Sequence, residues 1–222
     1  MATARFASFR LIAEDLSLER GGRTLLAHVD LALESGQALA ITGANGAGKS
    51  TMLRALAGLL PPAHGRVRLI GAPDEDVASH AHYVGHLDAS KPTLTARENL
   101  IFWQAMLALP EWRAALTPDE ALERLGLPHV ADLPVGYLSA GQKRRVGLAR
   151  LLLAPRPLWL LDEPTTALDR AAQAIFAGCM RDHLSDGGII VAATHAPLGI
   201  EALHLELGAP QAALTAPQAA LT

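Results

Sequence analysis

The sequence has one cysteine and lacks an uninterrupted apolar segment long enough to cross a bilayer. Cys179 cannot form a disulfide within the chain, and a lone thiol is typical of a reducing compartment. The most apolar run, 148–161, is interrupted by two arginines and two prolines. Residues 1–10 contain no signal-peptide core. We therefore expect a cytosolic chain that reaches a membrane only through a partner.

An excess of one charge is also missing. The chain of 222 residues has 19 Lys or Arg and 22 Asp or Glu, and no basic block. Proteins that bind nucleic acid usually concentrate positive charge, so we expect no nucleic-acid partner. Half of the residues are apolar, which is enough for one substantial core.

What the sequence does contain is a glycine-rich segment followed by Lys49 and Ser50. It follows an apolar run, 37–42, that predicts a buried strand, and it precedes 51–57, which predicts a helix. Glycines let backbone N–H groups wrap phosphates at the positive end of a helix, lysine adds a charge, and the serine hydroxyl can bind Mg²⁺. The residues predicted to bind the nucleotide here are Gly43, Ala44, Asn45, Gly46, Ala47, Gly48, Lys49, Ser50 and Thr51.

Strand and helix patterns around this loop predict an α/β fold with a mixed β sheet. The remaining predicted strands are 9–18, 24–27, 29–33, 66–70, 80–84, 157–161 and 189–194. The first three suggest an antiparallel β layer ahead of the loop. The predicted helices other than that of the loop are 95–109, 118–125, 142–153 and about 170–183. We expect the first three of these helices to form a helical subdomain, about 87–154, inserted into a parallel α/β core.

Polar residues follow two of the later strands. Asp162 and Glu163 come directly after 157–161, and His195 follows 189–194. Ligands bind at the carboxyl ends of parallel strands, so Asp162 is predicted to hold Mg²⁺ and Glu163 to act as general base for water. His195 is a candidate to orient the attacking water at the γ-phosphate.

The segment Leu138–Gln142 has a helix N-cap at Ser139, and Gly141 leaves backbone N–H groups accessible, so it predicts a second anion site. Together with the loop, Asp162-Glu163 and His195, it resembles the ATP-binding-cassette (ABC) ATPases over about residues 1–207. The resemblance implies an ABC-type P-loop NTPase core with ATP and Mg²⁺ as cofactors. It also implies a homodimer in which Ser139 and Gly141 cap ATP bound to the partner's loop.

Two positions depart from the usual family pattern. Arg20 stands where an aromatic residue commonly stacks on adenine; a guanidinium plane can also stack there. His86 stands where a glutamine is usual, and its ring could face the metal shell or a water. His80 and His82 lie two apart on a predicted strand; we expect them to be a solvated pair on one face rather than a metal site.

Several segments resemble one subfamily, the ATP-binding subunits of cytochrome c maturation complexes, also called haem exporters. These segments are 22–26, 85–86, 94–100, 133–135, 158–159 and 187–191. The resemblance implies membrane permease subunits as partners, haem or a haem chaperone indirectly, and a peripheral location on the cytoplasmic face of the inner membrane. Another ABC exporter, for drugs or lipids, is the alternative.

We expect residues 1–208 to form a single nucleotide-binding domain. The end of the chain, 209–222, is a seven-residue segment repeated once without change. Its composition predicts a low-complexity tail outside the chemistry.

Overall fold

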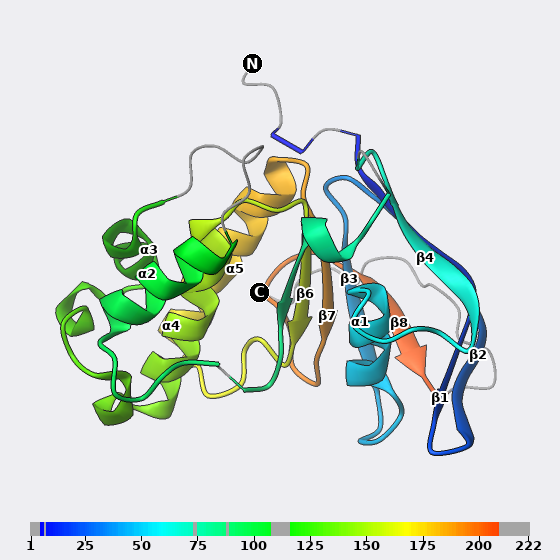
Figure 1. The fold of residues 1–222 in the computed structure, drawn as a ribbon, viewed down its shortest axis with the longest axis horizontal. Helices are drawn as coiled ribbons and strands as arrows, with labels where there is room; N and C mark the ends of the chain where they lie inside the picture. Colours follow the sequence, from blue (N-terminus) through cyan, green and yellow to red (C-terminus); the bar gives the residue numbers. More distant parts are fainter. Residues whose placement is uncertain (1–4, 7, 73–74, 88, 108–115, 209–222) are drawn as a thin grey trace.

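The computed structural model describes residues 5–6, 8–72, 75–87, 89–107 and 116–208. A five-stranded sheet runs through the middle of the molecule, between a three-stranded sheet on one side and a group of helices on the other (Figure 1). In spatial order, its strands are β5 (Ala81–Val84), β6 (Leu158–Asp162), β7 (Ile189–Ala193), β3 (Ala38–Gly43) and β8 (Leu203–Leu207). All of its pairings are parallel, so the mixture of strand directions comes from the two sheets together.

The parallel sheet separates two hydrophobic cores. In β6, Trp159 and Leu161 face the core on the helical side, whereas Leu158 and Leu160 face the core beneath the antiparallel sheet. Side chains alternate between the faces of a strand, so a strand covered on both sides must be apolar at every position. This explains why the strand runs in the sequence are continuous rather than alternating.

The antiparallel sheet has the order β2 (Arg23–Glu34), β1 (Arg10–Arg20) and β4 (His64–Ile70). The prediction of two strands at 24–27 and 29–33 was wrong, because both belong to β2. The apparent break lies at His28, which has a φ of 52° and contacts Asp15 across the pair, Nδ1 to Oδ1, at 2.6 Å. The register shifts there, so a bulge interrupts the alternation without ending the strand.

The helices are α1 (Lys49–Leu56), α2 (Ala96–Leu107), α3 (Pro118–Arg124), α4 (Ala140–Leu153) and α5 (Arg170–Ser185). Short 3₁₀ helices occupy Ala78–His80, Pro128–Val130 and Val135–Tyr137. Helices α2 to α4 follow β5 and precede β6, and they pack beside one another away from the antiparallel sheet (Figure 1).

Helices α2 and α3 each follow a capping box. The Thr95 hydroxyl accepts from the Glu98 N–H while the Glu98 carboxylate accepts from the Thr95 N–H, and Thr117 forms the same box with Glu120. The predicted end of the helix 95–109 and the repeated tail lie outside the described residues. Across the described part of the chain, no helix is both long and apolar enough to cross a membrane.

The expectation for His80 and His82 was wrong. His80 lies in the 3₁₀ helix before β5, not on the strand, and both side chains are buried. His82 Nε2 bonds to the carbonyl of Ala154 at 2.6 Å, and its burial lowers the imidazole pKa to about 3. Among the described residues, no three His, Cys, Asp or Glu side chains cluster in a way that could hold a metal ion.

Candidate active site

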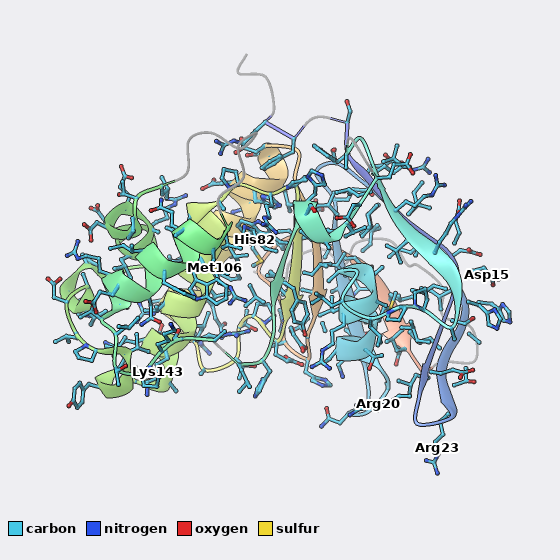
Figure 2. All side chains as sticks on the ribbon, in the orientation of Figure 1. Asp15, Arg20, Arg23, His82, Met106 and Lys143 are labelled. Atoms are coloured by element: carbon cyan, nitrogen blue, oxygen red, sulfur yellow. The ribbon has the colours of Figure 1, made fainter. Side chains whose placement is uncertain are left out.

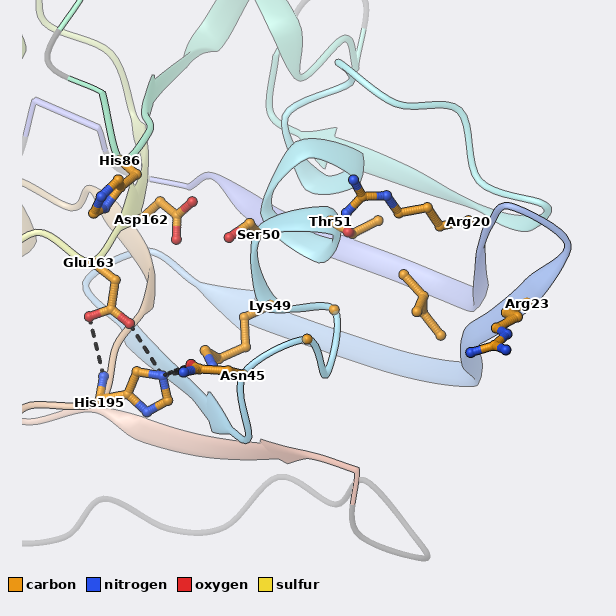
Figure 3. A pocket seen from close by; sticks show the side chains of 13 residues that line it. Arg20, Arg23, Asn45, Lys49, Ser50, Thr51, His86, Asp162, Glu163 and His195 are labelled. Carbon is orange, nitrogen blue, oxygen red and sulfur yellow. Dashed lines mark hydrogen bonds and ion pairs between the residues drawn. The ribbon is translucent and has the colours of Figure 1, made fainter.

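A cavity of about 480 Å³ opens at the carboxyl edge of the parallel sheet (Figure 3). It is bounded by the loop before α1, the end of β6, the segment that follows β7 and the turn between β1 and β2. The residues that line it are Arg20, Arg23, Leu25, Asn45, Gly46, Gly48, Lys49, Ser50, Thr51, His86, Asp162, Glu163 and His195. Segments separated by more than a hundred residues in the sequence therefore meet at one site.

The loop turns directly into α1, which begins at Lys49, two residues earlier than predicted. Gly48 is the N-cap and has a φ of 98°, a conformation that glycine adopts without a steric cost. The Lys49 ammonium is largely buried and donates to the carbonyls of Gly43 at 2.8 Å and Ala44 at 3.1 Å. The carbonyls of the loop thus hold a positive charge inside the cavity.

Asp162 and Glu163 stand at the end of β6 on opposite sides of a backbone turn. Asp162 is the last, buried residue of the strand, and its carboxylate and the Ser50 hydroxyl point toward each other (Figure 3). Glu163 has a φ of 49°, in the left-handed region, and its N–H donates to the Ala193 carbonyl at the end of β7 at 2.8 Å. This conformation aims the Glu163 carboxylate away from Asp162 and toward His195.

His195 links the loop and the Glu163 side chain. Its N–H donates to Glu163 Oε2 at 3.4 Å, and its ring Nε2 lies 3.0 Å from Lys49 Nζ, 3.0 Å from Asn45 Oδ1 and 3.7 Å from Glu163 Oε1. An ammonium can only donate and an amide oxygen can only accept, so Nε2 accepts from Lys49 in one tautomer and donates to Asn45 Oδ1 in the other. Four candidate residues from three segments of the chain therefore form one polar cluster.

The two positions that depart from the family pattern also line the cavity. Arg20 is the last residue of β1, at the turn to β2, and both Arg20 and Arg23 are exposed (Figures 2 and 3). His86 is exposed and lies on the Asp162 side (Figure 3). The sequence analysis did not predict that Arg23 and Leu25 line the cavity. Both follow Arg20 closely, after the Gly21-Gly22 turn, and this proximity could have indicated them.

Ser139 and Gly141 do not line the cavity. Ser139 caps α4 in a box with Gln142: the Ser139 hydroxyl accepts from the Gln142 N–H at 3.2 Å and the Gln142 side chain accepts from the Ser139 N–H at 2.9 Å. At Gly141 a Cβ would lie 2.7 Å from the Ala167 carbonyl, so glycine is required by a close backbone approach. Within one copy of the chain, these residues are separate from the phosphate loop.

Sequence reasoning also missed Arg144, a buried residue of α4. Its guanidinium donates to the main-chain carbonyls of Gly85, Asp162 and Glu163 at 2.9, 2.8 and 2.9 Å. It stands in a run of three basic residues after Gln142, and no feature of that run distinguishes the buried member from the others.

A glycine-rich loop at the start of a helix, facing an Asp-Glu pair at the end of another parallel strand of the same sheet, defines a P-loop nucleotide hydrolase. Residues 26–166 match the ABC transporter family, and the chain belongs to that family. It is an ATP-binding protein of the ABC type and hydrolyses ATP, and ATP-binding subunits of this family act with membrane permeases.

The chain is similar to proteins named cytochrome c biogenesis ATP-binding export protein CcmA. It is 54% identical to the one from Chelativorans sp. over 90% of this chain and 98% of the relative, and 52% identical to that of Mesorhizobium japonicum with the same coverage. A solved ATP-binding subunit of an ABC transporter matches with a TM-score of 0.77 and 23% identity, covering 93% of this chain and 89% of that one. This last likeness concerns the fold alone.

Proposed function

We propose that this chain is the ATP-hydrolysing subunit of an ABC complex in cytochrome c maturation, where hydrolysis drives haem export or the release of a haem-loaded chaperone. The observation that carries this proposal is the identity of 50–54% over most of the chain to proteins named for that process. An ATP-binding subunit of another exporter, for drugs or lipids, is the alternative from the same family. The subfamily resemblance and these identities favour the first.

Residues 43–51 would bind the nucleotide phosphates through backbone N–H groups and the Lys49 charge. Arg20 is proposed to stack on the base, since a planar guanidinium can replace an aromatic ring. The exposure of Arg20 at the rim of the cavity supports this role.

Ser50 and Asp162 would hold Mg²⁺, with His86 near the metal's water shell. The fit rests on their chemistry: a hydroxyl and a carboxylate that point toward each other are hard oxygen donors of the kind Mg²⁺ prefers (Figure 3). Bound Mg²⁺ would neutralise charge on the β- and γ-phosphates. A ring nitrogen is a poorer donor for this ion, so His86 fits a contact through water.

Glu163 is proposed as the general base that takes a proton from the attacking water, with His195 orienting that water. Glu163 is partly exposed, its carboxylate lies beside the Lys49–His195 cluster, and the left-handed backbone turn directs it there.

Ser139 and Gly141 would complete the site of a second copy in a head-to-tail homodimer. Their separation from the cavity within one chain supports a role in the partner's site.

We further propose that residues 1–208 act as one nucleotide-binding domain containing the helical subdomain at about 87–154. The dimer would bind membrane permease subunits on the cytoplasmic face of the inner membrane. The repeated tail, 209–222, is proposed to take no part in the chemistry.

The test uses a tagged Glu163→Gln variant isolated in detergent from its own membranes with Mg-ATP. The substitution keeps the size of the side chain and removes the base, so the variant should bind ATP, hydrolyse it slowly and trap the closed dimer. Partners are identified by mass spectrometry, and haem is measured by absorbance. Lys49→Ala, which weakens ATP binding, is the matched control.

Recovery of multi-span subunits together with haem or a haem-binding protein, dependent on ATP and reduced in Lys49→Ala, supports the cytochrome c role. Recovery of a different permease without haem moves the function to the alternative exporter. Wild-type turnover by Glu163→Gln would show that Glu163 is not the base.

A further inference from the structure

The side chain of Arg144 connects three segments that the candidate site needs. Its Nη1 donates to the carbonyl of Gly85, the residue before His86, and its Nη2 donates to the carbonyls of Asp162 and Glu163. The side chain is buried, with 4% of its surface exposed. Charge-assisted hydrogen bonds in a buried place are strong and directional, and the planar fork of arginine can serve several acceptors at fixed angles.

These bonds hold the backbone of Glu163 in an uncommon conformation. The φ of 49° is unfavourable for a residue with a side chain and persists only where the surroundings enforce it. The Glu163 N–H is held by Ala193 of β7, and its carbonyl accepts from Arg144 at 2.9 Å and from the Thr166 N–H at 3.3 Å. Rotation of either peptide would swing the carboxylate away from the His195 cluster.

Arg144 also belongs to the helix that begins with the Ser139 cap. It lies one turn beyond Gly141, whose backbone fits so closely against Ala167 that a Cβ would be 2.7 Å from the carbonyl oxygen. Two independent contacts therefore tie the start of α4 to the segment 162–167. A displacement of the start of α4 reaches Glu163 through hydrogen bonds and direct packing rather than through a flexible loop.

We propose that Arg144 is a positioning residue that transmits engagement of Ser139 and Gly141 with the partner's nucleotide to Glu163 of its own chain. This inference rests on the head-to-tail dimer of the proposed function. Binding at one site of the dimer would then align the base at the other. Arg144 touches no reacting atom and acts only through the Gly85, Asp162 and Glu163 backbone.

The experiment compares Arg144→Gln with Arg145→Gln in the complex isolated with its membrane subunits. Arg145 is the matched control because it is the next residue of α4 and also donates to carbonyls, those of Leu125 and Gly126, away from the cavity. Steady-state ATPase rates give kcat and KM, and a fluorescent ATP analogue gives affinity.

Misplacement of a catalytic group on the order of 1 Å can cost about 100-fold, so Arg144→Gln should lower kcat by about 10- to 100-fold with the ATP affinity unchanged within about twofold. Arg145→Gln should stay within about twofold of the wild type in both. Equal losses of kcat in the two variants, or a raised KM at unchanged kcat for Arg144→Gln, would overturn the proposal.

Arg144→Lys covers the case in which Arg144→Gln does not fold. Lysine keeps the positive charge, but its single ammonium cannot reach all three carbonyls that the arginine fork serves. The Arg144→Lys variant should therefore fold and recover only part of the wild-type kcat. A wild-type kcat in this variant would contradict the proposal.

The dimer is tested separately in the Glu163→Gln background. Adding Arg144→Gln should leave ATP-dependent dimer formation intact, because Arg144 acts after the dimer has closed on ATP. A double variant that still binds ATP but no longer forms the dimer would contradict the inference. If Glu163→Gln alone forms no dimer, the paired site of the proposed function fails together with transmission between sites. The kcat comparison then still decides whether Arg144 positions Glu163 within one chain.

Discussion

Acid should destabilise this fold through two histidines that are buried without charge. His82 bonds to the Ala154 carbonyl, and His183 stacks on Trp159 with the ring centroids 4.0 Å apart and the planes 9° from parallel. Burial lowers the pKa of each imidazole to about 3. An unfolded chain releases both rings to water, where the histidine pKa is about 6.5.

The sign of the effect follows from proton uptake. Between about pH 6.5 and pH 3 the unfolded chain binds more protons at these two positions than the folded chain does, so stability falls as the pH falls through that window. For a pKa of about 3 folded and about 6.5 unfolded, the free energy of unfolding at pH 5 drops by about 2 kcal/mol per histidine relative to pH 7.5. The pair contributes a loss of about 4 kcal/mol, a large part of a typical domain stability.

Urea unfolding at pH 7.5 and pH 5.0 measures how much of the free energy of unfolding is lost on acidification in the wild type, His82→Gln and His129→Gln. Glutamine can still donate to the Ala154 carbonyl but does not titrate, so His82→Gln should lose about 2 kcal/mol less than the wild type on acidification. His129 is exposed and serves as the control, with a loss equal to that of the wild type. If His82→Gln and the wild type lose the same stability, the assignment of His82 as a buried neutral group is wrong.

Three further outcomes follow from single contacts. Lys49→Ala should weaken ATP binding by about 100-fold or more because a charge-assisted phosphate contact is lost, and calorimetric titration measures it. Gly141→Ala should lower the free energy of unfolding by about 1–3 kcal/mol, since the new Cβ meets the Ala167 carbonyl, and should also slow ATP turnover; unchanged urea midpoints would contradict this. Asp169→Ala removes the N-cap of α5, whose carboxylate accepts from the Ala172 N–H, at a cost of about 1 kcal/mol; Asp169→Asn should retain the cap in the same urea assay.

Local sequence patterns predicted several strands and helices at nearly their observed bounds. The strand at 189–194 and the helix at about 170–183 correspond to β7 and α5 within one or two residues. Continuous apolar runs bounded by glycine or proline leave few other structures. The division of β2 into two strands failed because a bulge breaks the alternation just as a strand end does, and only pairing with β1 separates the two cases.

Some features of the candidate site could likewise be predicted from the sequence, and others could not. The loop at 43–50 and the pair Asp162-Glu163 consist of adjacent residues whose chemistry depends on their own backbone, so the sequence could indicate them. Burial of His82 was mistaken for exposure because it depends on what covers β5. The sequence holds no record of the helices and loops that pack over an edge strand.

Thus the sequence by itself determined the kind of chemistry: a phosphate loop, a carboxylate pair and a capped helix in the order that identifies the ABC family. The tertiary structure decided which of these meet. It gathered Lys49, Asp162, Glu163 and His195 at one edge of the sheet and left Ser139 apart. It also buried Arg144 against the backbone of Asp162 and Glu163. The physical reason is that local backbone preferences act over a few residues, whereas the order of strands and the packing of helices depend on contacts between distant segments, such as the pairing of Leu39 in β3 with Leu203 in β8.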